Sequence, residues 1–173
     1  MLIDNHGRQI NYLRLAVTDK CNLRCFYCMP AEGLNWLAKK ELMTDEELLR
    51  ICSLLVKMGI EKIRVTGGEP FIRKEIIKFL TELSKLNGLQ QITITTNGVL
   101  TAPLVPELKK IGIHPRNLSL DTLDREHIFS LTRQVELHCV LKTLKHLVLT
   151  HFNINLKVVL MDGIHIKVHK PMW

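Results

Sequence analysis

The chain has 173 residues, of which 46% are apolar and 24% are charged, so it is long enough for one globular domain with a sizeable core. No apolar run reaches membrane-spanning length, and residues 1–5 lack the basic and apolar segments of a signal peptide, so we expect a cytoplasmic protein without a membrane partner. The net charge is +7, but the lysines and arginines are scattered, which argues against nucleic-acid binding.

Strand and helix patterns alternate along the chain. A first strand is predicted at residues 13–18, and Thr44 with Glu47 then forms the capping box of a helix that Gly59 ends. The next elements are, in order, a strand at 62–66, a helix at 76–87, a strand at 92–96, a short helix at 103–112, a strand at 117–121, a helix at 140–148 and a strand at 154–160. This order predicts an α/β fold with a parallel sheet that is open or curled into a barrel.

Each predicted strand has one apolar and one polar face. A parallel sheet rarely exposes a face to water, so we expect the polar faces to line the concave side of a curved sheet. That side would carry an excess of positive charge, with Arg14, Lys62, Arg64 and Lys157 against Asp121. An anionic ligand such as a nucleotide phosphate would offset the excess. The alternative is that some of these side chains reach solvent at the barrel mouth.

The distinctive motifs lie in the loops that follow the predicted strands. They are the cysteine loop after residue 18, Gly67-Gly68-Glu69-Pro70, Thr95-Thr96-Asn97-Gly98, Ser119-Leu120-Asp121 and Met161-Asp162-Gly163. In β/α barrels such loops gather at the C-terminal face of the sheet, where active sites form. Five separate segments are therefore expected to meet at one mouth.

Three of the five cysteines, Cys21, Cys25 and Cys28, follow a CxxxCxxC pattern. Three thiolates can hold three irons of a 4Fe–4S cluster, and without a fourth cysteine one iron stays open to another ligand. A zinc site is the alternative, but structural zinc takes four ligands and no obvious fourth lies nearby in the sequence. Cys52 and Cys139 lie on helical patterns and are interpreted as small core residues.

With this cysteine spacing the chain resembles the radical S-adenosylmethionine (SAM) superfamily. More narrowly, residues 4–163 are similar to the GTP 3′,8-cyclases of molybdenum cofactor biosynthesis, the MoaA family. The matching segments include Gly7-Arg8, Tyr12-Leu13-Arg14, residues 17–22, Tyr27-Cys28-Met29-Pro30, residues 62–70, Thr95-Thr96-Asn97-Gly98 and residues 117–121. The resemblance implies a partial TIM-type (β/α) barrel of the radical SAM class, with about five parallel strands and helices outside.

The resemblance also implies the cofactors and their ligands. The metal ligands of the 4Fe–4S cluster would be Cys21, Cys25 and Cys28. The family positions at the SAM site are matched by Tyr27, Gly68 and Ser119. Glycines there would let the backbone approach the methionyl end of SAM. The family positions that bind GTP are matched by Arg14, Arg64 and Thr95. No residue is assigned a catalytic role of its own, since the cofactors carry the chemistry.

The implied activity is that of a lyase. One electron, delivered by an electron donor through the reduced cluster, cleaves SAM to methionine and a 5′-deoxyadenosyl radical. That radical removes hydrogen from C3′ of the GTP ribose, and the resulting carbon radical closes onto guanine C8. The product is (8S)-3′,8-cyclo-7,8-dihydroguanosine 5′-triphosphate.

Two features depart from the family. Its fifth strand carries a Lys-x-Asn pair, whereas this chain has Asn155 and Lys157 at those positions, which leaves a GTP contact there unassigned. Family members also continue further, with a sixth strand and three more cysteines for a second cluster that binds guanine. Residues 1–173 are therefore interpreted as a radical SAM core domain truncated before that region. Its open sheet edge favours association, a homodimer included.

For this chain alone we expect cluster binding, with GTP cyclisation weak or absent. Two alternatives stay open. One is a radical SAM enzyme that acts on another substrate, such as a peptide. The other is a non-catalytic remnant that binds a cluster or zinc and associates with a partner.

Overall fold

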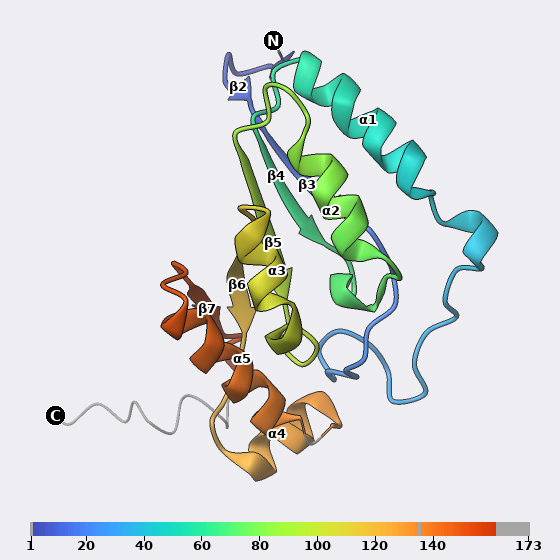
Figure 1. Ribbon diagram of the computed structural model, residues 1–173. Helices are drawn as coiled ribbons and strands as arrows, with labels where there is room; N and C mark the ends of the chain where they lie inside the picture. The colour runs from blue at the N-terminus through green and yellow to red at the C-terminus, as the bar shows by residue number, and fades with distance from the viewer. Residues whose placement is uncertain (1, 135, 162–173) are drawn as a thin grey trace, which may run out of the picture.

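The computed structural model describes residues 2–134 and 136–161. The main sheet has five parallel strands in chain order, namely β3 (Tyr12–Ala16), β4 (Lys62–Thr66), β5 (Gln91–Thr96), β6 (His114–Ser119) and β7 (Asn155–Lys157). Two short strands, β1 (Leu2–Ile3) and β2 (Gln9–Ile10), form a separate antiparallel ladder. The expected fold is confirmed, because the sheet is an open, partial TIM-type barrel with its helices outside (Figure 1).

The α-helices are α1 (Asp45–Lys57), α2 (Ile76–Ser84), α3 (Val105–Lys110), α4 (Arg125–Thr132) and α5 (Leu137–Leu149). Short 3-10 helices lie at Lys39–Glu41, Pro70–Ile72 and Ala102–Leu104. Figure 1 shows α4 at the end of the sheet to which the strand arrows point. Across the described residues, no helix has both the length and the apolar character that crossing a membrane requires.

The predicted start of α1 is confirmed by its hydrogen bonds. The Glu47 N–H donates to Thr44 Oγ1 at 3.2 Å, and the Thr44 N–H donates to Glu47 Oε2 at 2.8 Å. This reciprocal pair satisfies two donors that a helix start would otherwise leave without partners. The helix ends before Gly59, whose φ of 111° stops it as the sequence predicts.

The main core lies between the apolar faces of β3, β4 and β5 and the inner sides of α1 and α2. Ile63, Val65 and Ile94 are at most 1% exposed, and Leu80 and Leu83 of α2 are fully buried. Burial of each such side chain stabilises the fold by about 1.5–3 kcal/mol. Cys52 is fully buried in the same cluster, which confirms its interpretation as a core residue.

A second, smaller apolar cluster attaches α4 and α5 to the sheet. Leu118 and Leu120 supply the sheet side of this cluster, Ile128 comes from α4, and Leu137 and Val140 come from α5. Because α4 packs here, its last turn lies beside the carboxyl ends of the strands. This position matters for the cysteine loop.

The polar faces of the strands form rows across the sheet, as the alternation predicts. Arg14, Arg64 and Thr93 are successive register partners, as are Thr95, Asn117 and Asn155 one step nearer the carboxyl ends. A last pair joins Ser119 to Lys157. The register shifts between Thr93 and Thr95, opposite the part of β6 that contains Pro115, a residue without an N–H for the ladder.

Two elements differ from the prediction. The last strand spans three residues rather than 154–160, because the Val159 N–H donates to the Asp121 carboxylate at 2.9 Å instead of to a neighbouring strand. Helix α4 was not predicted, since its apolar residues do not gather on one face and Phe129 is exposed. The helix is started by Asp124, whose carboxylate accepts from the Glu126 and His127 N–H groups at 2.9 Å each.

Candidate functional site

The cysteine loop follows β3, and the end of α4 holds it through backbone hydrogen bonds. The Arg24 N–H donates to the Thr132 carbonyl and the Phe26 N–H to the Leu131 carbonyl, each at 3.0 Å. These carbonyls belong to the last turn of α4, where they have no partner inside the helix. Helix α4 therefore fixes the middle of the loop, between Cys21 and Cys28.

Arg133, directly after α4, ties the two halves of the loop together. Its backbone adopts the left-handed conformation, with a φ of 56° that residues with side chains rarely take. Its guanidinium donates to the carbonyls of Arg24 and Met29 at 3.0 and 3.1 Å. The guanidinium of Arg24 in turn donates to the Cys21 carbonyl at 2.8 Å. Both cations thus bind backbone carbonyls of the loop.

The glycine loop after β4 packs against the segment that leads into Cys21. The Gly68 N–H donates to the Thr18 carbonyl and the Glu69 N–H to the Lys20 carbonyl, both at 2.8 Å. A Cβ on Gly68 would lie 2.2 Å from the Lys20 carbonyl oxygen, and one on Gly67 would lie 2.4 Å from that of Thr18. The glycines are therefore required by the neighbouring backbone, a reason that the sequence did not reveal.

Glu69 is a buried carboxylate at the centre of this arrangement. It is 1% exposed and accepts from Thr96 Oγ1 at 2.8 Å, from the Phe71 N–H at 3.2 Å and from the Asn97 N–H at 2.8 Å. Burial raises the pKa of Glu69 to about 7, although the hydrogen bonds to the ionised form lower it. The carboxylate joins the glycine loop to the end of β5.

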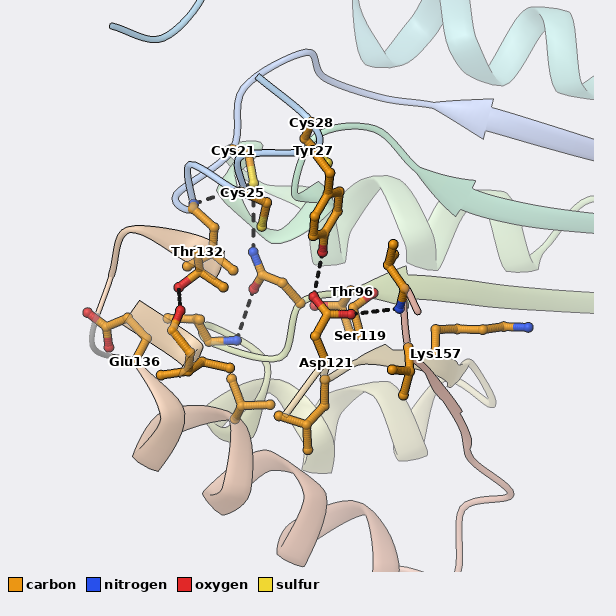
Figure 2. Close-up of a pocket in the computed structure, with 18 of the residues that line it drawn as sticks. Cys21, Cys25, Tyr27, Cys28, Thr96, Ser119, Asp121, Thr132, Glu136 and Lys157 are labelled. Carbon is orange, nitrogen blue, oxygen red and sulfur yellow. Dashed lines mark hydrogen bonds between the residues drawn. The ribbon is translucent and has the colours of Figure 1, made fainter. Parts of the chain in front are cut away.

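A cavity of about 410 Å³ opens at the carboxyl ends of the strands, a volume typical of small-molecule sites. Seven of the nine predicted site residues line it: Cys21, Cys25, Tyr27, Cys28, Gly68, Thr95 and Ser119. Figure 2 shows the three cysteines on one side and Thr96, Ser119 and Asp121 facing them. Four of the five loops that the sequence expected to meet line this cavity, namely all except the Met161-Asp162-Gly163 motif.

A hydrogen bond crosses this cavity from the cysteine loop to the end of β6. The Tyr27 hydroxyl donates to Asp121 Oδ2 at 2.5 Å, while Asp121 Oδ1 accepts from the Val159 N–H (Figure 2). Burial, and then the bond to Asp121, raise the pKa of Tyr27 above its usual range, so the hydroxyl remains a donor. Asp121 thus binds a phenol and a backbone amide, where the sequence analysis expected it to oppose cations.

Arg14 and Arg64 lie side by side on β3 and β4, but neither lines the 410 Å³ cavity. Arg14 is exposed, and the half-buried guanidinium of Arg64 lies 5.3 Å from the centre of the Tyr12 ring. Arg64 Nε is buried without a hydrogen-bond partner among the described residues. The sequence analysis expected both arginines to share one cavity with Lys157, and for this cavity the expectation is wrong. Arg64 lies four residues before Gly68, which is roughly 13 Å back along an extended chain. Lys62 is also exposed.

A family model described as the radical SAM superfamily matches residues 15–169. The chain belongs to this superfamily. Radical SAM proteins use a 4Fe–4S cluster and SAM, and solved relatives contain bound SAM.

Curated relatives are similar over most of this radical SAM chain. A GTP 3′,8-cyclase from Peptoclostridium acidaminophilum is 50% identical over 145 residues, which are 84% of this chain and 45% of the relative. One from Geobacter sulfurreducens is 50% identical over 140 residues, 81% of this chain and 43% of the relative. Molybdenum cofactor biosynthesis protein 1 from Homo sapiens is 42% identical over 165 residues, 95% of this chain and 26% of the relative. The chain spans about half or less of the length of these relatives.

Solved radical SAM structures share the fold. Streptococcus suis SuiB bound to S-adenosylmethionine has a TM-score of 0.69 and 25% identity, covering 86% of this chain and 33% of that one. SuiB bound to its precursor peptide SuiA has a TM-score of 0.71 and 25% identity, covering 86% and 32%. The native protein anSMEcpe with bound AdoMet has a TM-score of 0.67 at 20% identity, covering 84% and 43%, and supports the fold alone.

The cysteine loop places three thiols on one side of the cavity, which is the donor set that three irons of a 4Fe–4S cluster require. Among the described residues, the trio of His, Cys, Asp or Glu side chains with ligand atoms all within 4.8 Å is Glu136, His138 and Cys139. The three loop thiols are not such a trio, so at least one pair of their sulfur atoms lies more than 4.8 Å apart. Burial raises the pKa of the Cys25 thiol to about 11, so its ionisation at neutral pH needs the positive charge of a bound metal.

The two residues that depart from the family pattern lie on one side of β7. Asn155 Nδ2 donates to Asn117 Oδ1 at 3.5 Å. Lys157 lines the cavity, but Figure 2 shows its ammonium group directed away from the cysteines. The last predicted motif is described only at Met161, since residues 162 and 163 lie outside the described part of the chain.

The interpretation of Cys139 as a core residue is wrong. It is half-buried rather than buried, with its Sγ 3.3 Å from His138 Nε2. Helix α5 begins at Leu137, three residues earlier than predicted. Leu137 and Val140 occupy the inward positions, so Cys139 falls on the side of the helix.

Two residues that shape the site were missed in the sequence. Asn97 lines the cavity beside Cys21, and its only signal was its place in the Thr95-Thr96-Asn97-Gly98 loop after a strand. Arg133 gave no signal, because the carbonyls that it binds lie 104 and 109 residues away in the chain. A long-range contact to a backbone carbonyl leaves no mark on the residue types involved.

Proposed function

We propose that residues 1–173 are the radical SAM core domain of a GTP 3′,8-cyclase, a lyase of molybdenum cofactor biosynthesis. The observation that carries the proposal is the 50% identity to GTP 3′,8-cyclases over 145 residues. The convergence of seven predicted site residues on one cavity supports it. The proposed partners are GTP and an electron donor, in the cytoplasm, with a homodimer through the open edge of β7 and without nucleic acid or membrane.

The cavity supports the proposed cofactor assignments. Cys21, Cys25 and Cys28 would hold three irons of the cluster, whose open iron would bind SAM. Bound and reduced, these cofactors supply a carbon radical that removes hydrogen from the substrate. Tyr27 would contact SAM through its hydroxyl, which Asp121 holds in place. Gly68 would contact it through a backbone without a Cβ, and Ser119 through its hydroxyl. Apolar lining residues, among them Val99, Leu120 and Val140, would exclude water from the radical.

Arg14, Arg64 and Thr95 are proposed to bind GTP. Guanidinium groups match phosphate oxygens through paired N–H donors. Arg64 Nε is a buried donor without a partner among the described residues, which is the state expected of a group that meets its acceptor on a ligand. Thr95 lines the cavity and lies on the same polar face, one row nearer the cysteines.

Anaerobic reconstitution with iron and sulfide tests the proposal. We expect the chain to bind iron and labile sulfide and, after reduction, to release methionine and 5′-deoxyadenosine from SAM. Cys25→Ala should abolish both, whereas the matched control Cys139→Ala, outside the loop, should retain both. Protein that takes up zinc but no iron would contradict the proposal. Vigorous conversion of GTP would contradict the narrower expectation that this core alone is weak or inactive.

A second candidate is a radical SAM enzyme that acts on a peptide. Its support is the similarity to SuiB, whose solved complex contains the precursor peptide SuiA. The identity to SuiB is 25%, half of that to the GTP 3′,8-cyclases. Equilibrium binding separates the two candidates, since GTP should bind the reconstituted protein with a dependence on Arg64 that a peptide enzyme would lack.

A further inference from the structure

The Asn97 side chain directs both of its amide N–H groups at the cysteine loop. Its Nδ2 lies 2.8 Å from Asn22 Oδ1 and 3.8 Å from Cys21 Sγ, within hydrogen-bonding reach of sulfur. Its Oδ1 accepts from the Val99 N–H at 3.0 Å. The reversed amide would set an NH₂ group against the Val99 N–H, so the hydrogen-bond pattern fixes which atom faces the sulfur.

The backbone that carries Asn97 is held equally firmly. The Asn97 N–H donates to Glu69 Oε2 at 2.8 Å, and the other oxygen of this buried carboxylate accepts from Thr96 Oγ1. The Gly98 N–H donates to Thr96 Oγ1 at 3.0 Å. The donor therefore stands on the end of a core strand, clamped by a buried carboxylate, rather than on a free loop.

The sulfur of Cys21 also accepts from the Leu23 N–H at 3.5 Å. A backbone donor and a side-chain donor thus approach the same ligand atom from two segments of the chain. Reduction adds negative charge to an iron–sulfur cluster, and hydrogen bonds to its sulfurs stabilise the more negative state. Donors of this kind raise the reduction potential of the metal group.

We propose that Asn97 is a positioning residue for the cluster, which donates an N–H···S hydrogen bond to Cys21 and thereby raises the reduction potential. This inference rests on the proposed function in one respect, that Cys21 is a cluster ligand. It does not depend on the identity of the substrate. It assigns Asn97 of the Thr95-Thr96-Asn97-Gly98 motif a role toward the cluster rather than toward GTP.

Redox titration of the reconstituted chain, followed by electron paramagnetic resonance, tests the inference. In Asn97→Ala we expect the ratio of reduced to oxidised cluster at a fixed potential to fall about tenfold, a shift of about 59 mV for a one-electron couple. Iron and sulfide content should stay at the wild-type level. The matched control is Asn117→Ala, which removes the same amide from the polar face of β6, where it contacts Thr95 and not a cysteine. Its potential should equal that of the wild type.

An unchanged potential in Asn97→Ala, or an equal fall in both variants, would overturn the inference. If Asn97→Ala takes up no iron, the wild-type chain labelled with ¹⁵N in its asparagine side-chain amides answers the same question. Its reduced cluster should then show a ¹⁵N hyperfine coupling, and the absence of that coupling would overturn the inference. A wild-type chain that binds no iron would instead refute the proposed function itself, so the two failures are distinguishable.

Discussion

Two regions of the polar face of the sheet, the cysteine end at the carboxyl ends of the strands and the arginine end farther back on β3 and β4, differ in how many hydrogen bonds the described residues make there. At the carboxyl ends of the strands, Gly68, Glu69, Asn97 and the cysteine loop are joined by hydrogen bonds between segments up to 76 residues apart. In the middle of β3 and β4, Arg14 is exposed and Arg64 Nε is buried without a partner. The cysteine end is held together by these hydrogen bonds, whereas the arginine end includes one buried donor, Arg64 Nε, that has no acceptor among the described residues.

This difference is consistent with the proposed roles of the two regions, the cysteine end in holding the cluster and the arginines in binding the substrate. Backbone hydrogen bonds from the glycine loop and from the end of α4 fix the loop that would hold the cluster, so that end is preorganised before any ligand binds. The backbones of Arg14 and Arg64 are paired in the ladder of β3 and β4, and the Arg64 guanidinium also contacts the Tyr12 ring. We therefore expect substitutions that displace the backbone near the cysteines to affect folding and cluster uptake, and substitutions of the arginines to affect ligand binding.

The largest effect is expected at Gly68. In Gly68→Ala the new Cβ would meet the Lys20 carbonyl oxygen at 2.2 Å, and a backbone atom cannot rotate away. The glycine loop or the cysteine loop must shift, which should lower the free energy of unfolding by about 3 kcal/mol. Urea unfolding of the metal-free chain measures the loss, and iron uptake should fall with it.

Gly112→Ala is the matched control for this substitution. Gly112 has a φ of 71°, and no atom of the described residues lies within 4 Å of the position that a Cβ would take, so an alanine there meets backbone strain but no clash. Its cost should be about 1 kcal/mol, with iron uptake unchanged. Equal losses of stability in the two variants would refute the close approach of the two loops.

A smaller effect is expected from the buried carboxylate. Burial raises the pKa of Glu69 from its ordinary value of 4.5 to about 7, so the folded state binds more protons than the unfolded state between these values. Stability from this group is present below pH 4.5 and is lost as the pH rises through 7. Between pH 5 and pH 8 the loss should be about 2.5 kcal/mol.

Urea unfolding of Glu69→Gln at several pH values measures this contribution. The variant should be less stable than the wild type, but its stability should decline less steeply over the same pH interval. Glu107→Gln, at an exposed position of α3, should keep the wild-type slope. A wild-type slope in Glu69→Gln would show that other groups cause the pH dependence.

The fold was predictable wherever local signals decide it. Strand β4 was predicted with its observed bounds, because its apolar and polar residues alternate, and α1 was predicted from the capping box at Thr44. Helix α4 was missed because tertiary contacts stabilise it, through Ile128 and Leu131, rather than a regular apolar stripe. The length of β7 was overestimated because the Asp121 side chain, and not a neighbouring strand, binds the Val159 N–H.

The candidate site was predictable to the extent that its residues form short motifs. Cys21, Cys25 and Cys28 stand at spacings that a single loop dictates, and Gly68 follows a strand whose end the alternation identifies. Asn97 and Arg133 act through groups far away in the chain, so their roles depend on the folded arrangement. The same holds for Arg64. Alternation placed it on the polar face, but its position outside the cavity depends on where the cavity lies along β4.

The smallest effect is expected at the arginine end, where the fold should survive substitution. In Arg64→Ala a guanidinium that is half-buried and incompletely paired is removed, so stability should change little. If this group binds a phosphate, the dissociation constant for GTP, measured by titration calorimetry on the reconstituted chain, should rise about tenfold, since hydrogen bonds to charged groups contribute about 1.5–3 kcal/mol. Arg50→Ala, on the exposed side of α1, removes the same charge and should leave binding unchanged. Equal weakening by both variants would mean that net charge alone attracts the nucleotide, and the contrast between the two ends of the face would then lose its functional meaning.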